Sequence, residues 1–207
     1  MSISACTQAQ QRARDHLNDL TELWRAAHQP SVLQDVGQTL LVRFLTKRFI
    51  GEYASNANSL YRKRLSIDGR QLNLEIFDPC SQRGDSPHVP EEPLEWADAF
   101  VVVYAVSDHV TFLNAKHVLN QIKQGHKETC KGNVPVCLLG NKQDLCHSRQ
   151  VSEEEGRSLS LEHRCLFQEV SAAENYLDIA RLIRHVMEQM KRRSDCQRYS
   201  GKRRKSV

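Results

Sequence analysis

The chain has 207 residues, of which 40% are hydrophobic and 26% are charged, and its formal net charge is +4. This length and composition predict a soluble globular domain rather than a disordered chain. No apolar run approaches the roughly 20 residues of a membrane-spanning helix, and residues 1–11 lack the apolar centre of a signal peptide. We therefore expect a cytoplasmic protein, alternatively also nuclear.

The seven cysteines are an odd number, are widely scattered and include no Cys-x-x-Cys pair. A disulfide framework uses an even number of cysteines, and a zinc module needs closely spaced ligands. We therefore expect free cytosolic thiols.

The N-terminal segment, residues 1–39, carries one amphipathic pattern. Apolar residues recur at steps of three and four from Ala13 to Ala27, which predicts a helix over residues 6–29 that Pro30 ends. We expect this helix to dock on the body of the protein; a partner-binding helix is the alternative.

The next segments predict a helix, a hairpin and a loop. The helix covers residues 40–49 and ends near Gly51. Alternating apolar residues on either side of Asp68-Gly69, in 64–67 and 72–76, predict a β-hairpin. Residues 81–93 contain three prolines and one glycine, which is typical of a loop.

Further along the chain, short apolar runs alternate with helical patterns. The runs are residues 100–106, 134–139 and 166–170, and the predicted helices cover about 111–124, 152–162 and 176–192. Short runs without polar interruptions are typical of parallel strands that are buried on both faces. Together with the hairpin, they predict an α/β fold with a doubly wound, mostly parallel sheet.

Polar residues follow three of the predicted strands. Residues 78–82 (Asp-Pro-Cys-Ser-Gln) follow the hairpin, residues 140–144 (Gly-Asn-Lys-Gln-Asp) follow the second run, and residues 171–173 (Ser-Ala-Ala) follow the third. Ligands of open α/β sheets bind at the carboxyl ends of the strands. These three segments therefore predict one shared site.

Asn141-Lys142-x-Asp144, followed one strand later by Glu169-x-Ser171-Ala172, resembles the guanine-reading motifs of the Ras-like small GTPases. Residues 43–53, 71–82 and 201–207 are similar to the RERG branch of that family, and the likeness extends from about residue 40 to residue 207. The resemblance implies a six-stranded GTP-binding domain over residues 40–190, a P-loop NTPase fold. Such a domain binds GTP or GDP with Mg²⁺ and slowly hydrolyses GTP.

The resemblance also gives each residue of these motifs a role. The Asp144 carboxylate can accept two hydrogen bonds from the N1–H and 2-amino group of guanine, a donor pair that adenine lacks. Asn141 bridges the purine edge and a neighbouring loop, and the stem of Lys142 covers the ring face. The N–H matching that of Ala172 donates to the guanine O6, while Ser171 supports this loop. Ala173 completes the predicted nucleotide-binding set.

Phosphate binding in this family depends on a glycine-rich loop, G-x-x-x-x-G-K-[ST], between the first strand and the first helix. Its counterpart here is residues 32–39, with Gly37, Gln38 and Thr39 as the predicted remnant, and Gly37 or Gln38 stands where the lysine belongs. The buried first strand is also missing from residues 26–31, so two neighbouring strands lose their partner unless another segment replaces it. We interpret residues 1–39 as the product of an alternative or mispredicted first exon.

Two further family motifs are altered. The threonine that senses the γ-phosphate falls at Asn56, and Ser81 replaces a glycine whose N–H meets that phosphate. Asp78 keeps the carboxylate that meets Mg²⁺ through water. Gln82 keeps the amide that orients the attacking water, which makes it the predicted catalytic residue. An ordinary strand-end turn is the alternative for both.

The C-terminal tail, residues 191–207, carries eight basic side chains and one acidic one, so its net charge is +7, which leaves −3 for the preceding residues. Its last four residues contain no cysteine, so the prenylation usual in the family is not expected. A solvated end is the simplest interpretation. Weak contact with an anionic membrane is the alternative, and nucleic-acid binding is less expected.

These features predict a Ras-like signalling protein that binds guanine nucleotide, with GTP hydrolysis impaired by the loss of the glycine-rich loop. The alternative is a pseudo-GTPase, which acts as an interaction module without nucleotide cycling. Effector and regulator proteins are implied by the resemblance, but the sequence identifies none.

Overall fold

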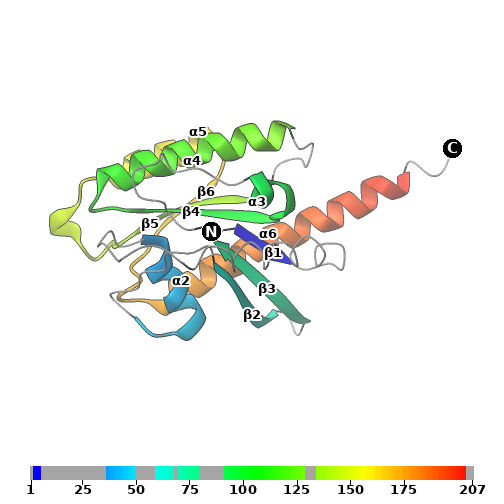
Figure 1. Cartoon of the computed structure of the whole chain (residues 1–207), viewed down its shortest axis with the longest axis horizontal. Coiled ribbons are helices and arrows are strands. Elements are labelled where there is room, and N and C mark those ends of the chain that lie inside the picture. The colour runs from blue at the N-terminus through cyan, green and yellow to red at the C-terminus, as the bar shows by residue number, and fades with distance from the viewer. Residues whose placement is uncertain are drawn as a thin grey trace, which may run out of the picture.

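The computed structural model of the protein describes residues 2–5, 36–49, 59–67, 70–79, 91–128 and 134–203. Its centre is a six-stranded sheet in the order β2-β3-β1-β4-β5-β6, with helices on both faces (Figure 1). The strands are β1 (Ser2–Ala5), β2 (Ser59–Ile67), β3 (Arg70–Asp78), β4 (Ala99–Ala105), β5 (Val136–Asn141) and β6 (Leu166–Glu169). The helices are α2 (Val36–Thr46), α3 (Glu91–Trp96), α4 (His109–Glu128), η1 (Cys146–Ser148, 3₁₀), α5 (Glu153–His163) and α6 (Tyr176–Arg203).

The sheet has a parallel half and an antiparallel half. β4 pairs with β5, and β5 with β6, in parallel, as the continuous apolar runs predict. β2 and β3 form the predicted antiparallel hairpin, in which Leu65 lies opposite Leu72. The α/β fold class and these strands are confirmed, and the predicted turn at 68–69 lies outside the described residues.

β1 fills the central position that the sequence left without a strand. It pairs antiparallel with both neighbours: Ser2 lies opposite Phe77 of β3 and Phe100 of β4, and Ala5 lies opposite Leu74. The first residues of the chain thus occupy this central position and satisfy backbone groups on both flanking strands. Thirty residues (6–35) separate β1 from α2, so no short loop fixes the direction of this strand.

Three element boundaries differ from the predicted ones. α2 begins at Val36, four residues earlier than expected, so the segment read as a remnant of a phosphate loop is helical. α3 overlaps the end of the loop predicted over 81–93, because Pro93 falls in the first turn, where a helix tolerates proline. α6 continues to Arg203 instead of ending near 192, since no proline and no glycine before Gly201 interrupts it. The helix predicted over 6–29 lies outside the described residues.

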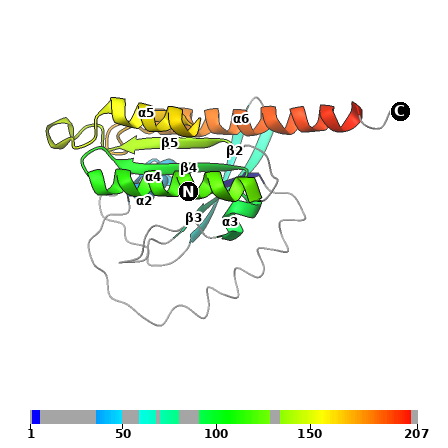
Figure 2. The ribbon, with the colours of Figure 1, turned by 90° about the horizontal axis from the view of Figure 1, so that it is seen from above.

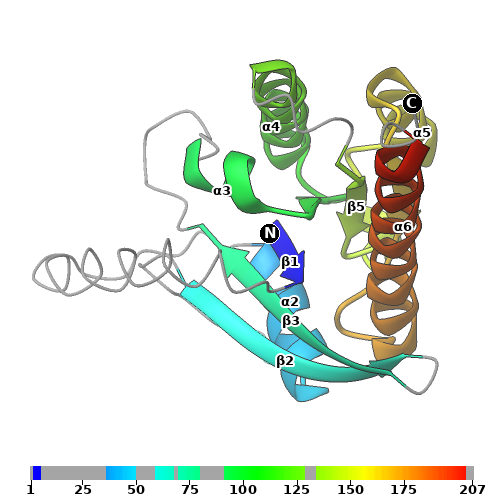
Figure 3. The ribbon, with the colours of Figure 1, turned by 90° about the vertical axis from the view of Figure 1, so that its right-hand side faces the viewer.

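Alternating residues of the central strands belong to two hydrophobic cores, one on each face of the sheet. Val101 of β4 and Leu139 of β5 belong to one core, which α2 and α6 cover. Tyr104 and Leu138 belong to the other core, which α4 and α5 cover. Figure 3 shows α4 and α2 on opposite sides of the sheet. This arrangement leaves the two ends of the strands as the places where loops can form a site.

α6 is the longest helix of the described part, and its 28 residues span about 42 Å. In Figures 1 and 2 its C-terminal part extends beyond the sheet. The predicted boundary between domain and tail at residue 191 therefore falls inside a continuous helix. Among the helices described, none is both long and apolar enough to span a membrane.

Candidate functional site

β3, β4, β5 and β6 point toward one edge of the sheet. β4, β5 and β6 are parallel, and β3 has the same direction as β4 because both are antiparallel to β1. Asn141 is the last residue of β5 and Ser171 comes two residues after β6, so the segments that follow these two strands lie at this edge. Asp78 is the last residue of β3, but Phe77 and Phe100 both lie opposite Ser2, so β3 ends level with the start of β4 and β5. The fold therefore brings two of the three predicted polar segments together and leaves Asp78 farther from them.

Asn141 connects the loop after β5 to the loop after β6. Its side chain is buried, and its Oδ1 accepts hydrogen bonds from the backbone N–H of Lys142, at 2.8 Å, and from that of Ala172, at 3.1 Å. The Gln143 N–H adds a second link by donating to the Val170 carbonyl at 3.2 Å. The two loops are thus joined by a side-chain bond and a backbone bond.

Lys142 adopts a left-handed backbone conformation, with φ of 65°. This region is costly for a residue with a Cβ and is tolerated where the surrounding structure imposes it. The Leu145 N–H donates to the Lys142 carbonyl at 3.0 Å, which closes a turn across Asp144. Asp144 is exposed, so its carboxylate is accessible to a ligand at this edge.

The loop after β6 is held by Ser171. This side chain is buried, and its Oγ accepts a hydrogen bond from the Glu174 N–H at 3.2 Å. Ala172 is buried and its N–H donates to Asn141, so a guanine O6 would have to take over this donor. Ala173 is exposed at the same loop.

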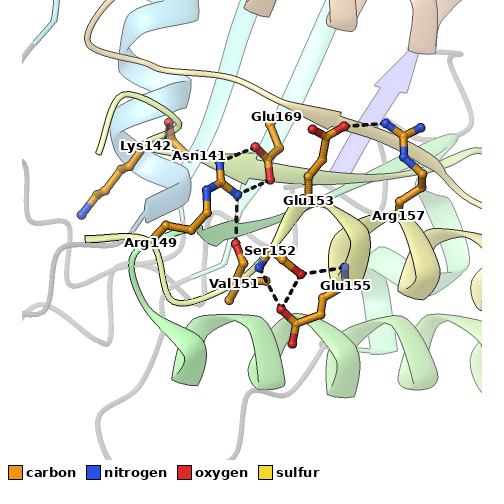
Figure 4. Close-up of polar contacts among 9 residues, drawn as sticks. All are labelled: Asn141, Lys142, Arg149, Val151, Ser152, Glu153, Glu155, Arg157 and Glu169. Atoms are coloured by element: carbon orange, nitrogen blue, oxygen red, sulfur yellow. Dashed lines mark hydrogen bonds and ion pairs between the residues drawn. The ribbon is translucent and has the colours of Figure 1, made fainter. Parts of the chain in front are cut away.

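A bidentate ion pair that the sequence did not single out lies behind these loops (Figure 4). The Arg149 Nη1 and Nη2 donate to Glu169 Oε1 and Oε2 at 2.8 and 2.7 Å, and the hydrogen bond to Glu169 raises the pKa of Arg149. Ser152 follows as the N-cap of α5 and forms a capping box with Glu155. Neither periodicity nor a motif marks Arg149, because it is one charged residue in a polar loop.

The phosphate side of the same edge is built differently. Gly37, Gln38 and Thr39 form part of the first turn of α2, with Gln38 buried, and this turn contains no lysine or arginine. β1 runs away from this edge and ends at Ala5, so its carboxyl end cannot lead into a phosphate loop here. These residues do not fit the cradle that holds nucleotide phosphates in P-loop proteins.

The structure describes only part of the predicted Mg²⁺ site. Asp78 is buried at the end of β3 and offers one carboxylate. Within the described ranges no group of three or more potential metal-ligating His, Cys, Asp or Glu side chains occurs. Asn56, Ser81 and the predicted catalytic Gln82 lie outside the described residues.

A depression of about 440 Å³ is lined by residues that include Val134 and Leu166, at the amino ends of β5 and β6. Three cysteines have side chains that the structure describes, Cys137, Cys146 and Cys165, and all three are free thiols, as predicted. Burial raises the pKa of Cys137 to about 12 and that of Cys165 to about 11, so both remain protonated at neutral pH.

The six-stranded sheet with helices on both faces defines an α/β domain, in which the loops after β5 and β6 are joined. Residues 34–192 match the model of the Ras family. The chain belongs to the Ras family. Membership implies, for the family in general, binding of GTP or GDP with Mg²⁺ and contacts with effector and regulator proteins.

Relatives indicate the branch of the family. The chain is 49% identical over 168 residues to a bovine (Bos taurus) Ras-related and estrogen-regulated growth inhibitor-like protein, covering 78% of this chain and 82% of the relative. It is 51% identical over 146 residues to the human protein of the same name, covering 70% and 71%. A Danio rerio Ras-like protein family member 11A-like is 36% identical over 166 residues, covering 76% and 64%. These likenesses agree with the RERG-like branch.

Proposed function

We propose that this protein binds the guanine base of a nucleotide at the loops after β5 and β6, through Asn141, Lys142, Asp144 and residues 171–173. The observation that carries the proposal is the bond between Asn141 and the Ala172 N–H, which holds the two loops together beside the exposed Asp144. A carboxylate in this place can accept hydrogen bonds from both guanine donors. Adenine lacks this donor pair, so the same site rejects it.

In this proposal the hydrolysis of GTP is impaired. The first turn of α2 offers no lysine to the β- and γ-phosphates, and Asp78 is the one described residue of the predicted Mg²⁺ and water-positioning set. Without these groups, charge that develops on the transferred phosphoryl group lacks its usual stabilisation. Binding energy then comes mainly from the base.

The test measures the affinity of the purified full chain for fluorescent GDP and GTP, with ADP as the control, in the presence and absence of Mg²⁺. We expect GDP and GTP to bind at least tenfold more tightly than ADP, with less than a threefold effect of Mg²⁺. Equal affinity for GDP and ADP would contradict the proposal. Tight binding that requires Mg²⁺ would instead indicate an intact phosphate site.

A second candidate function is a pseudo-GTPase that serves as an interaction module. The observation that favours it is the reversed β1, which ends at Ala5 away from the ligand edge and so supplies no phosphate loop there. No measurable affinity for any guanine nucleotide would support this candidate, whose partners would be signalling proteins.

We further propose that the basic segment 191–207 contacts anionic membranes weakly, in a protein that is otherwise cytoplasmic or nuclear. Its net charge of +7 supports an electrostatic contact. Binding to vesicles that contain phosphatidylserine should fall with salt and with deletion of 191–207. Binding that is insensitive to both would contradict this proposal.

A further inference from the structure

The ion pair between Arg149 and Glu169 is mostly enclosed by the protein. The side chain of Glu169 is 4% exposed and that of Arg149 is 26% exposed. Both carboxylate oxygens accept from the guanidinium, and Arg149 Nη1 also donates to the Val151 carbonyl at 2.9 Å. A planar guanidinium fork that binds a carboxylate in this way fixes orientation as well as distance.

The two partners come from the two segments that form the candidate base site. Arg149 ends the loop that begins at Asn141, and Glu169 is the last residue of β6, two positions before Ser171. The ion pair therefore closes a ring that also contains the bond from the Ala172 N–H to Asn141. Figure 4 shows Arg149, Glu169 and Asn141 on the same side of the sheet end.

Glycine permits the close approach of Glu169 to β5. A Cβ added to Gly140 would lie 3.1 Å from the Cγ of Glu169 and 2.9 Å from the hydroxyl oxygen of Tyr104. Glu169 is thus enclosed by Gly140, Tyr104 and Arg149. A buried carboxylate that loses its cation moves toward water or takes up a proton, and either change displaces the strand end that carries it.

A second ion pair in the same region provides a contrast. Glu153 and Arg157 are paired on α5, but their side chains are 56% and 62% exposed and both belong to one helix. Such a pair contributes little and connects no separate segments. Figure 4 shows both pairs. Arg157 serves as the exposed control for Arg149, although its guanidinium also lies 5.8 Å from the ring centroid of Phe167 in β6.

We propose that Arg149 is a positioning residue that, through Glu169, holds the loop after β5 against the loop after β6, so that Asp144 and residues 171–173 are held beside the same base. This inference rests on the proposed guanine binding. Arg149 itself touches no ligand in this arrangement. Arg149 should therefore affect the preference of the site for guanine over other bases, because the ligand contacts come from two loops whose separation Arg149 sets.

The experiment compares the full chain with Arg149→Gln and with Arg157→Gln, which makes the same chemical change at the exposed pair. Affinities are measured for GDP and for IDP, whose base lacks the 2-amino group that Asp144 would bind. Arg149→Gln should bind GDP at least tenfold more weakly and lose at least threefold of its preference for GDP over IDP. Arg157→Gln should stay within twofold of the unmodified chain in both values.

Amide hydrogen exchange provides a readout that needs no ligand. Arg149→Gln should speed exchange at least fivefold in both 142–145 and 171–175, and Arg157→Gln should change neither segment. If the unmodified chain binds no guanine nucleotide, the proposed function fails. The exchange rates then still test whether Arg149 holds the loop after β5 against the loop after β6. Unchanged exchange in both loops would overturn the inference.

Stability is separated from positioning by two further variants. Arg149→Gln/Glu169→Gln removes the buried charge as well as its partner, and it serves if Arg149→Gln does not fold. Arg149→Lys keeps the charge without the fork and should recover part of the GDP preference. A folded Arg149→Gln or double variant that keeps the unmodified ratio of IDP to GDP affinity would overturn the inference, whatever its melting temperature.

Discussion

The segments proposed to bind the base contrast with those at the position of the family's phosphate loop, although both belong to one domain. On the base side, the loops after β5 and β6 are joined by Asn141, by a backbone bond and by the ion pair of Arg149 with Glu169. On the phosphate side, β1 is reversed and α2 begins without a lysine. The sheet is therefore complete. The loops after β5 and β6 are joined to each other, whereas β1 and the start of α2 supply no phosphate loop.

This contrast separates what a sheet needs from what a site needs. A central strand must satisfy backbone groups on both neighbours, and four residues in either direction can do part of this. A phosphate loop needs particular residues at the carboxyl end of a strand with one direction. Reversal of β1 is therefore compatible with the fold and incompatible with that loop.

The largest expected effect concerns β1. Ile3→Pro removes a backbone donor and restricts φ in a central strand, between Ile76 and Ala99. We expect a loss of about 2–3 kcal/mol in the free energy of unfolding, the cost of a lost ladder bond with its partner left buried. Urea denaturation measures it, with Ile3→Val as the control. Equal stability of both variants would show that β1 contributes nothing to the sheet.

The next prediction concerns the base side. Asp144→Ala removes the exposed carboxylate that is proposed to accept from guanine. We expect the affinity for GDP to fall about 30-fold, or about 2 kcal/mol, while the thermal stability stays unchanged. Glu154→Ala removes an equally exposed charge from α5 and should leave the affinity unchanged. Equal effects of the two variants would indicate a general charge effect.

Packing behind the base side gives a smaller effect. A Cβ on Gly156 of α5 would lie 2.5 Å from the Tyr104 hydroxyl oxygen and 2.6 Å from Phe167 Cε2. Gly156→Ala should therefore cost about 1–2 kcal/mol of unfolding free energy, because the strain outweighs the better helix propensity. Thermal or urea unfolding measures it. A more stable Gly156→Ala would contradict the tight packing of α5 on β4 and β6.

Tyr104→Phe tests the same contact from the side of the Tyr104 hydroxyl. The hydroxyl of Tyr104 is buried and has no hydrogen-bond partner among the described residues. Its removal should stabilise the protein by about 1 kcal/mol. In the double variant Tyr104→Phe/Gly156→Ala, loss of the hydroxyl should also relieve part of the strain that the alanine Cβ causes. Additive effects of the two changes would mean that the two side chains do not meet.

The smallest expected effect is a pH dependence at the end of α5. The His163 side chain is 3% exposed, its Nε2 lies 3.8 Å from Glu162, and burial holds the pKa of His163 below its ordinary value. Lys123 and Lys116 also lower this pKa, whereas Glu162 raises it. The folded state therefore binds fewer protons than the unfolded state, so stability is present above the ordinary histidine pKa of about 6.5 and is lost as the pH falls toward the folded value.

Melting temperatures between pH 7.5 and 5.5 measure this effect, with His163→Gln as the comparison because it removes the titrating group. The unmodified chain should lose more stability over this range than the variant does. Identical pH profiles would mean that His163 titrates alike in both states. A steeper profile for the variant would reverse the predicted sign.

Much of the fold follows from local sequence signals. The apolar runs predict β4 and β5 to within two residues, and the alternating residues around 68–69 predict the hairpin. Ser152 followed by Glu155 gives the start of α5. These signals are reliable because burial on both faces, alternation and capping are each properties of a few consecutive residues. The end of α6 was missed, because basic composition suggested a tail while nothing broke the helix.

The sequence by itself determined which residues are proposed to bind the base, because Asn141, Asp144 and Ser171 stand in short motifs directly after strands. Only the tertiary structure decided what fills the centre of the sheet, since four residues at the start of the chain carry no pattern that selects a partner or a direction. It likewise decided that Arg149 meets Glu169, twenty positions away. Contacts between segments that are distant in the sequence depend on the tertiary fold, and no pattern of a few consecutive residues specifies them.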